Sequence, residues 1–157
     1  GRFVGANDMA RTNEVISAGF MIGICYSATL ALIYITFRFP LVEVFAPPAG
    51  DFSEIRELSA FMMIGLSSYA MADAIISVSG GVLRGAGDTR WLMYASVILH
   101  WAMLVSQYFI ILVWEYGPRI SWLAFCVLIF AIAVVYVWRL RGGIWRDPER
   151  LKLVMAE

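Results

Sequence analysis

Four long apolar runs, separated by short polar breaks, dominate the pattern of this chain. Each run carries at most one charge and is long enough to cross a bilayer as an α-helix, which takes about 20 apolar residues. The runs are 15–37, 58–83, 91–114 and 120–138. An alternating pattern of barrel strands is absent, and in lipid the other way to satisfy every backbone polar group is the helix. The pattern predicts an all-α membrane protein with four transmembrane helices.

The breaks between the runs contain the residues that usually end helices. They hold charged residues together with proline or glycine, at 38–51, 84–90 and 115–118. Residues 51–57 are predicted to form the polar first turns of the second helix, and residues 1–13 a polar turn before the first. Such short loops predict that helices adjacent in the sequence pack as antiparallel neighbours.

Composition agrees with a lipid environment. Hydrophobic residues make up 61% of the chain and charged residues 15%, and the mean hydropathy is +0.76. The 12 basic residues balance the 12 acidic ones, so no nucleic-acid partner is predicted, because phosphate binding needs a concentrated basic face. Cys25 and Cys126 lie in apolar runs and are predicted to be small buried side chains rather than disulfide or metal-binding residues.

Basic residues near the spans predict the orientation of the helices. With the N-terminus on the cytoplasmic side, nine Lys or Arg residues lie on that side and only Arg38, Arg56 and Arg119 lie on the other. Lys and Arg favour the cytoplasmic side, so both termini are predicted to be cytoplasmic. Tryptophans at or just beyond the span ends support the boundaries, because indole prefers the headgroup region: Trp91, Trp114, Trp122, Trp138 and Trp145.

The first run contains a stripe of small residues at four-residue spacing: Gly19, Gly23, Ser27 and Ala31. Such a stripe lets another helix approach closely and predicts a packing face. A second interpretation is a surface that slides during a conformational change.

Asp73 is the one acidic residue inside any predicted span. It lies 10 positions before Leu83, which places it roughly 15 Å from that end of the helix. A carboxylate at this depth is unfavourable by about 2.5 to 3.5 kcal/mol, so it should face protein or a wet cavity. Tyr69, Ser77 and Gly80 follow the same helical stripe. The carboxylate of Asp73 together with phenolic and hydroxyl oxygens suits Na⁺ or a proton. The alternative is a structural hydrogen-bonding role for Asp73.

His100, in the third run, is as far from the intervening turn as Asp73 is, so the two are expected at the same depth. His100 is therefore a candidate proton relay, and its alternative is a hydrogen bond between helices. Gln107 lies one heptad further along the same face, which indicates that this face looks into protein or water.

Residues 80–90 contain a Gly-x-Gly core, but no third glycine follows at the spacing of a nucleotide-binding loop, and a membrane span precedes it. Structural roles fit better. Arg84 can reach the headgroups and offset the helix dipole, and Gly85 can adopt the left-handed cap. Asp88 or Thr89 can cap the next helix.

The same turn resembles a motif of the multidrug and toxic compound extrusion (MATE) family, in which Leu-Arg-Gly-x-Gly-Asp-Thr joins the penultimate pair of helices. Here the motif is Leu83, Arg84, Gly85, Ala86, Gly87, Asp88 and Thr89. The opening residues 4–8, Val-Gly-Ala-Asn-Asp, followed by Ala10, resemble the preceding cytoplasmic loop of the family. The resemblance covers the whole chain, residues 1–157, as the last four of twelve helices.

In the NorM-like branch of that family, the tenth helix carries a Tyr and an Asp four residues apart that help to bind the coupling cation. Tyr69 and Asp73 have this spacing and the matching distance before Arg84. The resemblance therefore implies that they are cation-coupling residues. It also implies an acidic partner in a seventh helix upstream. Ile76 stands where NorM-like sequences tend to have Gln, so the resemblance does not extend to the substrate contacts.

What the resemblance implies is a secondary active multidrug efflux transporter, not an enzyme, that exchanges small organic cations or amphipathic drugs for Na⁺ or H⁺. No other cofactor is implied, and no metal beyond Na⁺ at Asp73. The expected partners are the lipid bilayer, the remaining eight helices and the substrate, and the expected location is the bacterial cytoplasmic membrane, crossed several times. A mid-membrane carboxylate supports a coupling role independently.

Two other classes stay open. A lipid-linked oligosaccharide flippase of the same superfamily would share the helix count, although it would usually carry basic residues deep in its spans. A structural membrane anchor would not depend on Asp73. The lack of an initiator Met suggests an excised fragment of a longer transporter. Its tail, 139–157, is expected to be cytoplasmic, with a short interfacial helix at 148–155.

Overall fold

Four antiparallel helices form the body of the computed structural model, which describes residues 1–6, 8–47 and 51–146. They are α2 (Met9–Thr36), α4 (Ser53–Gly85), α5 (Thr89–Tyr108, extended by the π-helix η1, Phe109–Val113) and α6 (Pro118–Arg141). All four are long and apolar enough to cross a membrane. The described residues contain no strand. The predicted all-α architecture with four spans is confirmed.

The helices extend further into the polar breaks than predicted. The expectation of a polar turn over residues 1–13 is wrong, because α2 begins at Met9 and is capped by Asp8, whose carboxylate accepts a hydrogen bond from the backbone of Arg11 at 3.1 Å. Similarly, Asp51 accepts from the backbone N–H of Ser53 at 3.0 Å, where α4 starts. Hydropathy detects only the apolar part of a helix, whereas capping residues set its ends.

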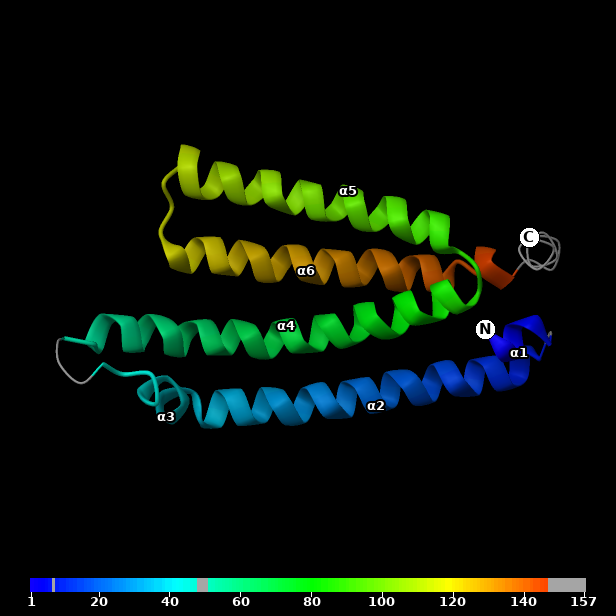
Figure 1. The fold of residues 1–157 in the computed structure, drawn as a ribbon, viewed down its shortest axis with the longest axis horizontal. Coiled ribbons are helices and arrows are strands. Elements are labelled where there is room, and N and C mark those ends of the chain that lie inside the picture. The colour runs from blue at the N-terminus through cyan, green and yellow to red at the C-terminus, as the bar shows by residue number, and fades with distance from the viewer. Residues whose placement is uncertain (7, 48–50, 147–157) are drawn as a thin grey trace.

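The helices lie in the order α2, α4, α6 and α5 (Figure 1). The α4–α5 turn is short, yet the two helices diverge from it, and α6 lies between them along most of their length. The prediction that a short loop makes sequence neighbours pack together therefore fails for this pair. α4 instead packs against α2 on one side and α6 on the other.

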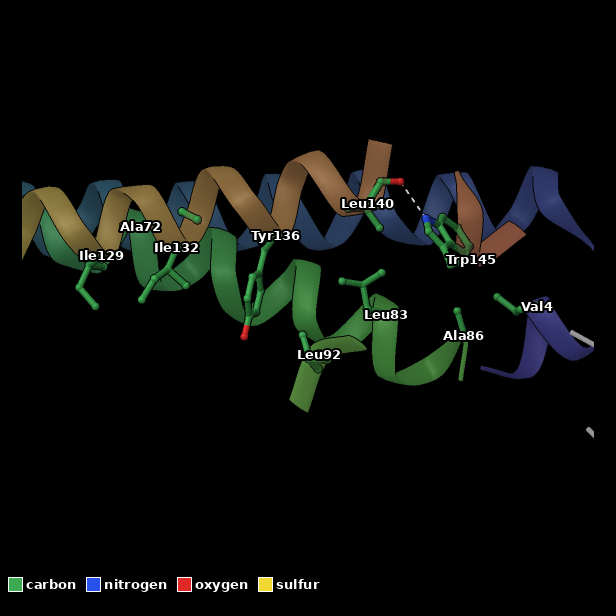
Figure 2. Close-up of a cluster of buried hydrophobic side chains, with 11 residues drawn as sticks. Val4, Ala72, Leu83, Ala86, Leu92, Ile129, Ile132, Tyr136, Leu140 and Trp145 are labelled. Atoms are coloured by element: carbon green, nitrogen blue, oxygen red, sulfur yellow. Dashed lines mark hydrogen bonds between the residues drawn. The ribbon is translucent and has the colours of Figure 1, made fainter. Parts of the chain in front are cut away.

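The main apolar core lies between α4 and α6, toward the end of the bundle that holds the α4–α5 turn (Figure 2). Ala72 and Leu83 of α4 are fully buried, and Ile132 of α6 is 2% exposed. Trp145, predicted to lie just beyond a span end, is 1% exposed and donates its indole N–H to the carbonyl of Leu140 at 2.7 Å. This bond satisfies the one polar atom of the indole, so the ring can close the end of the core.

Toward the other end, Gly65 allows α6 to approach α4 closely. A Cβ at Gly65 would overlap the Trp122 ring, whose N–H donates to the carbonyl of Met62 at 3.1 Å. Cys126 is buried beside the carbonyl of Gly65. Cys25, by contrast, is exposed on α2, so its predicted burial is wrong for the described residues.

Three short helices complete the described part: α1 (Arg2–Gly5), α3 (Arg38–Glu43) and η2 (Ile144–Arg146). α3 is held to α4 by Arg56, which bonds Glu43 at 2.7 Å and covers the ring of Phe39 at 4.5 Å. The predicted interfacial helix at 148–155 lies outside the described residues.

Candidate functional site

A groove of about 410 Å³ runs between α2 and α4 and contains the predicted site residues of α4. Tyr69, Asp73 and Ser77 all line it, as their four-residue spacing on one helix requires. The remaining lining residues are Gly23, Tyr26, Ser27, Leu30, Tyr34, Leu66, Ala70, Ala74 and Val78. The structure therefore brings Asp73, Tyr69 and Ser77 together at one surface.

The Asp73 carboxylate is exposed in this groove. Among the described residues it makes no hydrogen bond or ion pair. Its two oxygens are therefore available to an ion entering the groove, and carboxylate oxygens are the ligands that Na⁺ and protons share. The alternative role, a hydrogen bond to a neighbouring hydroxyl, does not occur within the described part.

The neighbouring Tyr69 is held in place by aromatic packing. Its ring stacks on Phe125 of α6, with centroids 5.9 Å apart, and Phe125 in turn stacks on Trp122 at 5.4 Å. Offset stacking of this kind adds roughly 0.5–1.5 kcal/mol beyond burial and restricts the ring. Tyr69 is therefore fixed from the α6 side while it lines the groove on the α2 side.

The small-residue stripe of α2 closes one end of the groove. A Cβ at Gly19 or Gly23 would lie 3.4 Å from the methyl groups of Val78 on α4. Ser27 is 2% exposed and donates its hydroxyl to the carbonyl of Gly23 at 2.8 Å. The prediction that the stripe is a packing face is confirmed, and its partner is α4.

Tyr26 and Tyr34, which also line the groove, were missed by the sequence reasoning. They lie seven residues after Gly19 and Ser27 and so continue the face of the stripe. Reading the stripe onward by heptads would have found them. Their rings supply aromatic faces on the wall of α2 that lies opposite Asp73.

The structure does not bring His100 to Asp73. His100 is exposed on α5, and its Nδ1 lies 2.7 Å from the backbone carbonyl of Ser96, one turn earlier in the same helix. α6 separates α5 from α4, and Asp73 lies on the α2 side of α4. Equal depth in the sequence pattern does not imply contact, because helix order decides which faces meet.

The expectation that the face of His100 and Gln107 looks into protein or water is met for protein only at Gln107, since His100 is exposed. The side-chain amide of Gln107 donates to the carbonyl of Ser121 at 3.1 Å and accepts from the Ser121 hydroxyl at 2.7 Å. This pair of bonds joins the end of α5 to the start of α6.

The glycine motif forms the α4–α5 turn, with different roles from those predicted. Gly85 remains in the helix, so its predicted left-handed conformation is wrong; Gly87 adopts it, with φ of 79°. Gly85 instead provides close approach, since a Cβ there would lie 2.8 Å from the backbone nitrogen of Gly1. Arg84 is in the last turn of α4, as expected for a cation at a helix C-terminus.

Asp88 occupies the N-cap position of α5, but its side chain makes no capping bond there. Its carboxylate, 1% exposed, instead accepts from the guanidinium of Arg139 on α6 at 2.8 Å. Arg139 also lies over the ring of Trp91 at 5.0 Å. The acid of the motif therefore fastens the turn to the end of α6, a contact that no local pattern reveals.

No group of three or more His, Cys, Asp or Glu side chains gathers into a metal site within residues 1–6, 8–47 and 51–146. Any cation in the groove would meet one carboxylate and neutral oxygens from this part of the chain.

The MatE family model matches residues 1–109, which contain α1 to α5 and end at the first residue of η1. No solved structure matches the chain.

Proposed function

Because the chain belongs to the MatE family of membrane transporters, we propose that it is part of a secondary active efflux transporter in which Asp73 is the cation-coupling carboxylate. The observation that carries the proposal is the position of Asp73. It is a carboxylate in the middle of a membrane-spanning helix, it lines a groove, and it has no ionic partner in the described residues. Intramembrane acids of this kind mark ion pathways.

The chemistry of the groove suits exchange. A proton and Na⁺ compete for the same carboxylate oxygens, and the hydroxyls of Tyr69 and Ser77 are neutral oxygens on the same stripe. A site that holds one ion in one conformation and releases it in another is what coupled transport requires. Asp73 and Tyr69 thus form the proposed coupling pair of an antiporter driven by Na⁺ or H⁺.

The opposite wall favours organic cations or amphipathic drugs as the exported substrates. Tyr26 and Tyr34 line the groove with aromatic rings, and a ring face attracts a cation by about 0.5–2 kcal/mol. A substrate cation and the coupling ion would then compete for Asp73. Such competition ties export of the one to import of the other.

We further propose the bacterial cytoplasmic membrane as the location, with both termini cytoplasmic and eight further helices of a NorM-like transporter completing two lobes. The N-terminus and η2 lie at the same end of the bundle, as an even number of spans demands (Figure 1). The excess of basic residues at that end supports the orientation. Cysteines introduced after Arg141 should not be labelled from outside intact cells. Labelling from the outside alone would overturn the proposed orientation.

The coupling role is tested with Asp73→Asn in the full-length transporter, reconstituted in vesicles with an imposed Na⁺ or pH gradient. The substitution keeps the size of the side chain and removes its charge. We expect loss of gradient-driven export and unchanged membrane insertion. Glu54→Gln is the matched control, because it removes an acid from the first turn of the same helix, and it should export at the parental rate.

Parental export by Asp73→Asn with unchanged Na⁺ and pH dependence would overturn the coupling role and return Asp73 to a structural one. Tyr69→Phe tests the second member of the pair. It removes one hydroxyl, so we expect ion dependence to weaken by no more than about 1.5–3 kcal/mol in apparent ion affinity.

A further inference from the structure

A second polar cavity, away from the groove, lies where the end of α4, the start of α5 and α6 meet. Its volume is about 300 Å³, and it is lined by Arg84, Thr89, Leu92, Met93, Ser96 and Tyr136. It lies at the end of the bundle that contains the α4–α5 turn, which is a boundary between membrane and water. Four of the six lining side chains can donate hydrogen bonds.

Three of the four donors in this cavity, those of Arg84, Thr89 and Tyr136, make no hydrogen bond within the described part of the protein, whereas the Ser96 hydroxyl lies 3.5 Å from Nδ1 of His100. Tyr136 is 5% exposed, yet its hydroxyl has no hydrogen-bond partner there, and neither does the Thr89 hydroxyl. The ring of Tyr136 extends from α6, with the hydroxyl pointing away from the α6 ribbon (Figure 2). A hydroxyl without a protein partner at the wall of a cavity can donate to an acceptor bound there.

The guanidinium of Arg84 lies at the same cavity as Tyr136. A Cβ at Gly80 would lie 3.7 Å from both terminal guanidinium nitrogens of Arg84 and 3.5 Å from Cε2 of Tyr136. The guanidinium and the phenol ring therefore both lie close to the bare backbone of Gly80. Arg84 forms no ion pair with any described residue, so its two parallel N–H donors remain available for a bidentate acceptor.

The surroundings strengthen the preference for an anion. The first turn of α5 receives no side-chain capping bond, so its backbone N–H groups add positive potential beside Thr89. The nearest acid, Asp88, is bonded to Arg139. From this cavity, the apolar surface of α5 continues into the membrane: Met93 is 54% exposed, Val97 52% and Trp101 63%.

We propose that this cavity binds the phosphate of an anionic phospholipid. Arg84 holds two phosphate oxygens, the hydroxyls of Tyr136 and Thr89 donate to the phosphate, and an acyl chain lies along the exposed face of α5. Basic pockets between transmembrane helices are suited to such headgroups, and a free anion would make no use of the adjoining apolar surface. The site does not depend on the proposed transport activity, because Asp73 and the α2–α4 groove take no part in it.

Native mass spectrometry of the delipidated full-length protein tests the proposal with phosphatidylglycerol and phosphatidylcholine of identical acyl chains. We expect phosphatidylglycerol to bind about tenfold more tightly, because phosphatidylcholine has the same phosphate but carries a choline cation that Arg84 repels. Arg84→Gln should abolish this preference. Tyr136→Phe, which keeps the buried ring, should weaken phosphatidylglycerol binding about threefold. Arg90→Gln is the control, since Arg90 is exposed at the same end and does not line the cavity.

Three results would overturn the assignment. Equal binding of the two lipids would remove the charge preference. An equal loss in Arg84→Gln and Arg90→Gln would show attraction to the basic surface in general. Competition by millimolar inorganic phosphate as strong as that by the lipid would identify an anion site without a lipid.

Discussion

The two sides of α4 differ in how tightly they are packed. Toward α6, Ala72 and Leu83 are fully buried against large residues such as Ile132. Toward α2, the neighbour of Ala72 in the sequence, Asp73, is exposed in a groove of about 410 Å³. A single helix therefore fixes the site from one side and leaves it accessible from the other, which is how a rigid scaffold presents a functional residue.

The difference arises from the partner helices more than from α4 itself, which presents small residues on both sides. α6 fills its side with Ile129, Ile132 and Tyr136. α2 offers Gly19 and Gly23 at one end, where the helices touch, while larger side chains line the groove. We expect the rearrangements of a transport cycle on the α2 side, because the groove that holds Asp73 lies there.

The largest effect on stability is expected where the motif is fastened to α6. Asp88→Asn keeps the shape but leaves the guanidinium of Arg139, 11% exposed, without its counter-charge. Breaking a buried pair in this way typically destabilises by about 3–5 kcal/mol. The measurement is unfolding of the full-length protein by SDS in mixed micelles.

Glu43→Gln is the matched control for Asp88→Asn, because it breaks the exposed pair between Glu43 and Arg56 at the other end. Exposed pairs contribute about 0–1 kcal/mol. Equal losses in the two variants would contradict the view that the α6 side is the rigid one.

A smaller loss is expected from Gly65→Ala on the α6 side of α4. The new methyl group would overlap the Trp122 ring, and overpacking of this kind costs about 1–3 kcal/mol. Gly81→Ala, in the same helix, has no atom within 4 Å of the new methyl and should stabilise by up to about 1 kcal/mol through helix propensity. If both variants unfold like the parent, the close approach of α6 at Gly65 is wrong.

On the α2 side, Gly19→Ala should change stability by less than about 1 kcal/mol in the same assay. The methyl group would lie 3.4 Å from Val78, an ordinary contact, and the gain in helix propensity offsets the crowding. A loss as large as that of Gly65→Ala would show that the two sides are packed alike, and the contrast between them would disappear.

The sequence predicts the helices well because a long apolar run has one stable form in lipid. It also predicts that Tyr69, Asp73 and Ser77 share one face of a helix, because they are four residues apart. It does not predict which helices are neighbours. The order with α6 between α4 and α5 separates His100 from Asp73, and this order depends on side-chain fit across helices. The bond from Asp88 to Arg139 likewise joins residues 51 positions apart, beyond any local pattern.

The smallest effect concerns the start of α4, which lies outside both packed faces. The hydroxyl and backbone N–H of Ser53 hold the pKa of Asp51 below its ordinary value of 3.8, because they stabilise the ionised carboxylate. Since the folded pKa is the lower one, the stabilisation of the helix start by Asp51 is complete above the unfolded pKa and is lost as pH falls through the folded pKa.

Ser53→Ala removes the hydroxyl and keeps the backbone donor, so the pKa of Asp51 should move toward 3.8 without reaching it. A carbon-13 NMR titration of the Asp51 carboxyl checks this, with Glu57→Gln as a control that leaves the contact intact. An unchanged titration in Ser53→Ala would mean that the hydroxyl does not contribute.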